Sequence, residues 1–213
     1  AEQGFSQGHE ALEGLVDVDN LIDYMLVIFY TGNFDAPTGA FTHNQGPNNF
    51  FALFNRVSPG AGFVFFAHDS EHSLLPVSFS PGVGLAEDRV NLGTRNDDYR
   101  MNVNDFANFH PQWLHHRLTA SAEYRALFHQ HAAQRFAGQL SSEANLARVE
   151  EREAQIELAI VAESARWGDS KRSTPRTRDE DWIPAVRRLK EDWIPYRNAV
   201  VLAQLEAAGL YQP

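Results

Sequence analysis

The sequence contains no cysteine, and only two of its 213 residues are lysines, Lys171 and Lys190. Without cysteine the chain can form neither a disulfide nor a thiolate metal site, so any metal ligands come from other residue types. Both lysines lie in the C-terminal quarter of the chain, whereas the other sixteen basic residues are arginines. The first three quarters therefore have arginine as their only strong side-chain cation.

Long apolar runs and excess positive charge are also missing. No apolar run approaches the roughly 20 residues that a membrane helix needs. No signal peptide is visible at the start, which leaves a processed chain or a fragment of a longer one as the two interpretations. The formal net charge is -10, and an acidic surface repels phosphate backbones, so nucleic acid is a poor partner.

A chain of this length suits one domain. Such a domain can bury roughly 70% of the surface that its unfolded chain exposes, so it needs no disulfide or structural metal for stability. We divide it into a core at residues 17–72, an irregular segment at 73–109, and a helical region at 110–213. The irregular segment is rich in proline, glycine, asparagine and aspartate. A stretch of that kind inside a domain is typically functional or mobile, and it could bind a substrate.

The core is expected to begin with a helix that ends near Tyr30. Asp17 or Asp19 can cap its start, its apolar residues recur at helical spacing, and Gly32 is a natural stop. The helix delivers Asp35 at its C-terminal end.

A β-hairpin is expected next. Two short apolar runs flank the turn-forming sequence SPGAG at residues 58–62, and the second run is apolar on both faces, which predicts a buried strand. With the turn centred near Pro59, Asn49 falls opposite Asp69 at one end of the hairpin.

Oxygen-bearing side chains therefore gather at this rim of the hairpin. The expected set comprises Asp35, Asn48 or Asn49, Asp69 and Glu71. Hard divalent cations such as Mg²⁺ take oxygen ligands of this kind together with substrate phosphates. Kinase sites use a base-like aspartate, a later metal-binding asparagine and a second aspartate, and the order Asp35, Asn49, Asp69 follows that arrangement.

Three other interpretations of these motifs stay open. Asp35 and Asn49 could be turn residues, with Asp69 acting as a cap. His68 and His72 flank carboxylates and could hold Zn²⁺ or Mn²⁺ for a hydrolase. The sequence GFSQG at residues 4–8 matches the nucleophile elbow of serine hydrolases, but it lacks room for the strand that must precede it.

The region from residue 110 onward is predicted to be helical. One helix starts at Pro111, a second is capped by Ser121 and closed by Gly138, and a third, long one starts at Ser141 or Ser142 and ends near residue 167. Two echoes of the same sequence follow, EDWIP at residues 180–184 and at 191–195. We read them as the starts of two short helices that pack through their tryptophans.

Several ordered motifs resemble the spore-coat protein H (CotH) kinase family. They are DNLIDYM (residues 19–25), GNFD (32–35), NNF (48–50), HDSEHSL (68–74) and AESARWGD (162–169), together with Trp193, Pro195, Arg197 and the closing GLY (209–211). The last two groups resemble the bacterial secreted or envelope branch of the family, and the likeness covers nearly the whole chain from Asp17.

The resemblance implies an atypical protein-kinase-like fold that uses Mg²⁺ and ATP to phosphorylate serine on protein substrates. In that fold Asp35 resembles the catalytic aspartate, and Asn49 or Asn48 resembles the metal-binding asparagine. Asp69 resembles the essential metal-binding aspartate, and Glu71 is the second acid of its motif.

Two features depart from the family pattern. The loop between Asp35 and Asn49 is longer than usual, and no lysine precedes Asp69, although a kinase needs a cation on the nucleotide phosphates. The chain therefore resembles the C-terminal lobe of a kinase, mainly α with a small antiparallel hairpin. The β-rich lobe would come from an upstream segment or a partner chain. The alternative is a degenerate, non-enzymatic module that docks in an extracellular or coat assembly.

Overall fold

The computed structural model describes residue 12 and residues 14–58, 60 and 62–213. The GFSQG motif and the expected turn centre at Pro59 lie outside these residues. The described part is mainly α with one two-stranded antiparallel sheet, as expected. No described helix has both the length and the apolar character that a membrane crossing requires.

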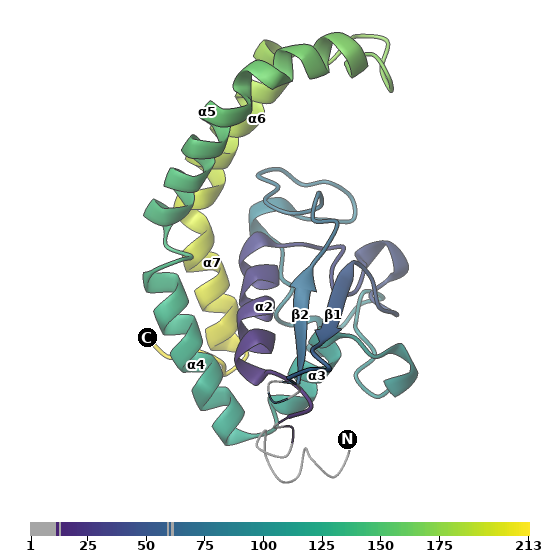
Figure 1. Ribbon diagram of the computed structural model, residues 1–213, viewed down its shortest axis with the longest axis vertical. Coiled ribbons are helices and arrows are strands. Elements are labelled where there is room, and N and C mark those ends of the chain that lie inside the picture. Colours follow the sequence, from purple (N-terminus) through teal and green to yellow (C-terminus); the bar gives the residue numbers. More distant parts are fainter. Residues whose placement is uncertain (1–11, 13, 59, 61) are drawn as a thin grey trace.

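Helix α2 (Val18–Thr31) lies at the centre of the fold (Figure 1). Asp17 caps it by accepting a hydrogen bond from the backbone N–H of Asn20, and Gly32 ends it in the left-handed region at φ 61°. Most of its apolar side chains are fully buried. The predicted helix is therefore confirmed, and it is a core element on more than one face.

Strands β1 (Phe50–Phe54) and β2 (Phe63–Ala67) form the predicted hairpin. Its register pairs Phe50 with Ala67 and Phe54 with Phe63, so the turn is centred between residues 58 and 59. Continued past the strand ends, this register sets Asn49 opposite His68, and Asn48 opposite Asp69. The expected pairing of Asn49 with Asp69 is wrong by one residue, because the turn is centred half a residue earlier than Pro59.

One face of the hairpin packs on α2. The Asn20 side chain accepts from the Phe65 N–H at 2.6 Å and donates to the Phe65 carbonyl at 3.3 Å. Phe65 is 4% exposed and its ring contacts Tyr24. These contacts fix the hairpin against the central helix.

The other face of the hairpin is open, so the prediction of a buried second strand is wrong. Phe51, Leu53 and Phe66, which share this face, are 55%, 59% and 45% exposed. Apolar residues on both faces suit a strand covered on both sides, but here α2 covers only one side. A three-residue apolar surface is left beside the rim that carries Asp69.

The segment between the hairpin and α3 is irregular, as predicted. Its helical pieces are single 3₁₀ turns, η4 (Gly84–Ala86), η5 (Leu92–Thr94) and η6 (Phe106–Asn108). Another 3₁₀ turn, η2 (Ala40–Thr42), lies in the loop after Asp35.

Three predicted helices follow with the expected caps. They are α3 (Pro111–Leu118), α4 (Ala122–Ala137) and α5 (Ser142–Trp167). Ser121 and Ser141 each accept a backbone N–H at the start of α4 and α5. Figure 1 shows α5 running beyond the body of the molecule, beside the returning C-terminal helices.

The two EDWIP echoes do not start separate helices. The chain is helical from η7 (Arg178–Trp182) through α6 (Ile183–Arg188) and η8 (Leu189–Trp193) into α7 (Ile194–Ala207), with η7 and η8 as π turns. A proline removes one backbone donor and crowds the preceding turn, and a wider π turn before Pro184 and Pro195 accommodates that. Trp193 is buried against Tyr30, with ring centroids 5.4 Å apart.

Arg197 of α7 ties the C-terminal helix to the core. Its guanidinium is fully buried and donates to the carbonyls of Phe29, Tyr30, Leu85 and Glu87 at 2.5–2.9 Å. Two of these carbonyls belong to the last turns of α2. Carbonyls there lack hydrogen-bond donors from a following turn of helix, and the helix dipole favours a cation. The arginine thereby fixes the end of the helix from which Asp35 emerges.

Candidate functional site

Asp35 lies three residues after the αL cap of α2, in a loop that is held from several sides. The Asn33 side chain, 1% exposed, accepts a hydrogen bond from the Asp35 N–H at 3.0 Å. Arg89, also 1% exposed, donates to Asn44 Oδ1 at 3.0 Å and to the Thr38 carbonyl at 2.6 Å. The long loop between Asp35 and Asn48 is thus anchored to the core.

Both asparagines of the NNF motif meet the Asp35 carboxylate. Asn48 Nδ2 donates to Asp35 Oδ1 at 2.8 Å, and Asn49 Nδ2 donates to Asp35 Oδ2 at 2.9 Å. Asn48 also donates to the Asp35 carbonyl at 2.8 Å. Because each amide nitrogen faces Asp35, each amide oxygen is the end available to another partner.

The close approach of these groups requires a glycine at position 39. A Cβ on Gly39 would lie 2.8 Å from Asp35 Oδ1 and 3.1 Å from Asn48 Nδ2. A larger residue there would push the carboxylate and the amide apart.

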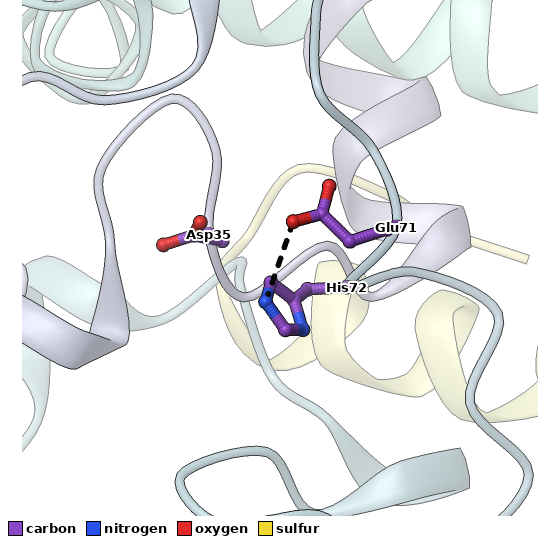
Figure 2. A group of neighbouring side chains, drawn as sticks. All are labelled: Asp35, Glu71 and His72. Atoms are coloured by element: carbon purple, nitrogen blue, oxygen red, sulfur yellow. Dashed lines mark ion pairs between the residues drawn. The ribbon is translucent and has the colours of Figure 1, made fainter. Parts of the chain in front are cut away.

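Figure 2 shows the second half of the site, which follows β2. The ligand atoms of Asp35, Glu71 and His72 all lie within 4.8 Å of one another, and His72 Nε2 is 3.5 Å from Glu71 Oε1. Glu71 is exposed, whereas Asp35 and His72 are partly buried. The group joins two segments that are more than thirty residues apart in sequence.

Asp69 is adjacent to this group and is not one of its members. It is exposed and adopts the left-handed region at φ 49°, two residues after the end of β2, and Asn49 does the same directly before β1, at φ 43°. Aspartate and asparagine tolerate this conformation better than most residues. Of the sequence-based candidates, the structure brings together Asp35, Asn48, Asn49 and Glu71, with Asp69 two residues from Glu71.

His72 belongs to the group although the metal-site prediction did not include it there. Its ring packs against Phe34, Phe41 and Phe79, with centroids 5.0, 5.0 and 5.9 Å away. His68 instead packs against Phe51 at 4.5 Å and lies outside the group. His68 and His72, proposed as a zinc or manganese pair, therefore do not come together. In the part of the chain that the structure describes, the cluster that could hold a metal contains His72 without His68.

The electrostatics of Asp35 differ from those of an ordinary surface carboxylate. Burial raises the pKa of Asp35, and the negative charge of Glu71 acts in the same direction. The charges of His72 and Arg89 and the Asn48 hydrogen bond oppose this increase in the pKa. A carboxylate with a raised pKa is a stronger base than an ordinary surface carboxylate.

The family assignment agrees with this arrangement. The sequence matches the family described as CotH kinase protein over residues 5–201, which is most of the chain. The chain belongs to the CotH kinase family. No curated protein and no solved structure matches it.

Membership of the CotH kinase family gives the cluster a chemical context. The carboxylate and amide oxygens gathered at this rim are of the kind that Mg²⁺ prefers, whereas His72 adds an imidazole. Arg89, which anchors the loop after Asp35, is a further residue that sequence reasoning missed. A buried arginine leaves no local signal when its partners lie about 45 and 51 residues away.

Proposed function

We propose that this chain is the catalytic and metal-binding part of a CotH-type protein kinase that phosphorylates serine on protein substrates. The observation that carries the proposal is the Asp35 carboxylate, which two asparagines hold and which lies within 4.8 Å of Glu71 and His72. Membership of the CotH kinase family supports the same reaction class.

In this mechanism Asp35 orients the serine hydroxyl and accepts its proton as the hydroxyl oxygen attacks the γ-phosphorus of ATP. The bond from that phosphorus to the ADP oxygen breaks. Asn48 and Asn49 hold both oxygens of Asp35 in place, and the raised pKa of Asp35 suits a base. Asp69, Glu71 and one asparagine oxygen are the groups that would hold Mg²⁺, which neutralises phosphate charge when bound.

The open face of the hairpin supports a two-lobed kinase. Phe51, Leu53 and Phe66 form an exposed apolar surface that ends at Asn49 and Asp69. A β-rich lobe, from an upstream segment or a partner chain, would cover this surface and supply the cation for the nucleotide phosphates. We further propose a secreted or cell-envelope location, which rests on the likeness of the C-terminal motifs to that branch of the family.

The test is ATP- and Mg²⁺-dependent labelling of a serine substrate by the complete kinase, which is this chain together with the upstream segment or partner chain that supplies the β-rich lobe. Asp69→Ala should abolish labelling, whereas Asp98→Ala, an exposed aspartate outside the cluster, should leave it intact. Equal labelling by the wild-type protein and Asp69→Ala would contradict the proposal.

A docking module without catalysis is the second candidate. The open apolar face and the absence of lysine before Asp69 favour it. Calorimetry with Mg²⁺-ATP on the complete protein separates the two functions. The absence of a heat of Mg²⁺-ATP binding, together with tight binding to another envelope or coat protein, would favour the docking function.

A further inference from the structure

A cavity of about 360 Å³ lies where the arm formed by α5 and α6 meets the body of the molecule. From the body it is lined by Tyr30 and Leu74, and from the helices by apolar side chains. Those side chains are Val149, Ile156, Trp182, Val186 and Leu189. This size and composition are within the range of small-molecule sites, which combine apolar walls with a few converging polar groups.

The polar groups of the cavity include a buried hydroxyl and two arginines. The Tyr30 hydroxyl is buried and has no hydrogen-bond partner, in a residue that is 2% exposed. The neighbouring Asn145 side chain donates one amide hydrogen to the Ser141 carbonyl and accepts from Arg148. Burial raises the pKa of Tyr30, and Asn145 lies close enough to the Tyr30 hydroxyl to oppose this rise, but not within hydrogen-bond distance of it. A buried hydroxyl without a partner is unfavourable, and a ligand oxygen would satisfy it.

Positive charge at the cavity is not balanced by the residues that line it. Arg148 bonds only to the Gln139 carbonyl and the Asn145 amide, and Arg152 has no hydrogen bond or ion pair among the described residues. The lining carboxylate, Glu153, is already paired with Lys190 at 2.5 Å. The cavity therefore offers an apolar interior, one free hydroxyl and two arginines without a carboxylate partner.

We propose that this cavity binds a small amphipathic carboxylate, with its apolar chain between α5 and α6 and its carboxylate toward Tyr30 and the two arginines. Burial of the ligand's apolar chain supplies the affinity, and the polar groups of the cavity orient the ligand's carboxylate. None of these residues belongs to the Asp35 site, so the proposal is independent of kinase activity.

Calorimetry with dodecanoate, below the concentration at which it forms micelles, tests the proposal. We expect saturable binding of one molecule per chain and an increase in Tm with ligand concentration. Dodecyltrimethylammonium, which has the same chain and the opposite charge, should bind at least about tenfold more weakly.

Three variants test the geometry. Tyr30→Phe keeps the ring and should weaken dodecanoate binding about threefold to tenfold, and Arg152→Gln should weaken it about tenfold. Val149→Trp should abolish binding by filling the cavity. Arg187→Gln is the matched control, because Arg187 is exposed on α6 and does not line the cavity.

Either of two outcomes would overturn the proposal. One is the absence of saturable dodecanoate binding, which includes non-saturable uptake of the amphiphile. The other is binding that is equal for the two head groups or unchanged in both Tyr30→Phe and Arg152→Gln.

Discussion

At the scale of single residues, the account depends on how Asp35 is held. Its two carboxylate oxygens accept from different asparagines, its backbone N–H is bonded to Asn33, and Gly39 leaves room for this approach. Such a carboxylate has little freedom to rotate. The carboxylate is therefore held in one orientation for accepting a proton.

The charge of Glu71 should be measurable at Asp35. We predict that the Asp35 carboxyl titrates above 3.8 and that Glu71→Gln brings its pKa down, because the variant removes a nearby negative charge. Carbon-13 NMR of the carboxyl group in Mg²⁺-free buffer measures both values. Asp98→Asn should leave the Asp35 pKa unchanged, and an unchanged value in Glu71→Gln would show that the two groups do not interact.

At the scale of elements, local signals in the sequence predicted much of the structure. The caps at Asp17, Ser121 and Ser141 and the αL glycine at position 32 act through neighbouring atoms, so the sequence alone reveals them. The hairpin followed from its apolar runs. Its register differed by one residue, because a turn rich in glycine and proline does not fix its own centre.

What the sequence could not supply depends on distant contacts. Whether a strand is covered on one face or two depends on which elements pack against it. Among the described residues, α2 packs on one face of the hairpin, and Phe51, Leu53 and Phe66 on the other face are exposed. The loop contacts of Arg89 and the carbonyl contacts of Arg197 join segments 45 or more residues apart. His72 joins Asp35 for the same reason, through packing against three phenylalanines that no spacing rule connects.

The two faces of the hairpin should respond differently to mutation. Phe65→Ala, on the face packed against α2, should cost about 3–5 kcal/mol of unfolding free energy. Phe51→Ala, on the open face, should change it by no more than about 0.5 kcal/mol and should reduce binding of a hydrophobic dye. Urea unfolding of both variants checks this, and equal costs would mean that another element covers the open face.

At the scale of the whole molecule, two buried histidines make the fold sensitive to acid. Burial lowers the pKa of His110 to about 4 and that of His115 to about 3, against 6.5 for the free side chain. As the pH decreases, both histidines become protonated in the unfolded chain before they do in the folded protein. The free energy of unfolding therefore has its full value above pH 6.5 and falls as the pH decreases toward 4 and then 3. In this range each histidine contributes a slope of about 1.4 kcal/mol per pH unit.

A conservative variant separates this effect from general acid unfolding. An asparagine at position 110 can still cap α3 by accepting a hydrogen bond from the Trp113 N–H, so the His110→Asn variant should fold. Its unfolding free energy should depend less steeply on pH than that of the wild type, by the contribution of one proton. Unfolding free energies between pH 7 and pH 5 measure the slope. His43→Asn, at an exposed site, should keep the wild-type slope, and the same slope in all three proteins would contradict the assignment.

Steady-state kinetics of Asp35→Asn in the complete kinase, with the β-rich lobe present, test the central claim most directly. If Asp35 is the base that two asparagines hold, kcat should fall by about 10²–10⁴-fold. The KM for ATP should stay within about twofold, because Asp69 and Glu71, not Asp35, are assigned to the metal and nucleotide. An unchanged kcat, or a loss confined to the KM for ATP, would contradict the account.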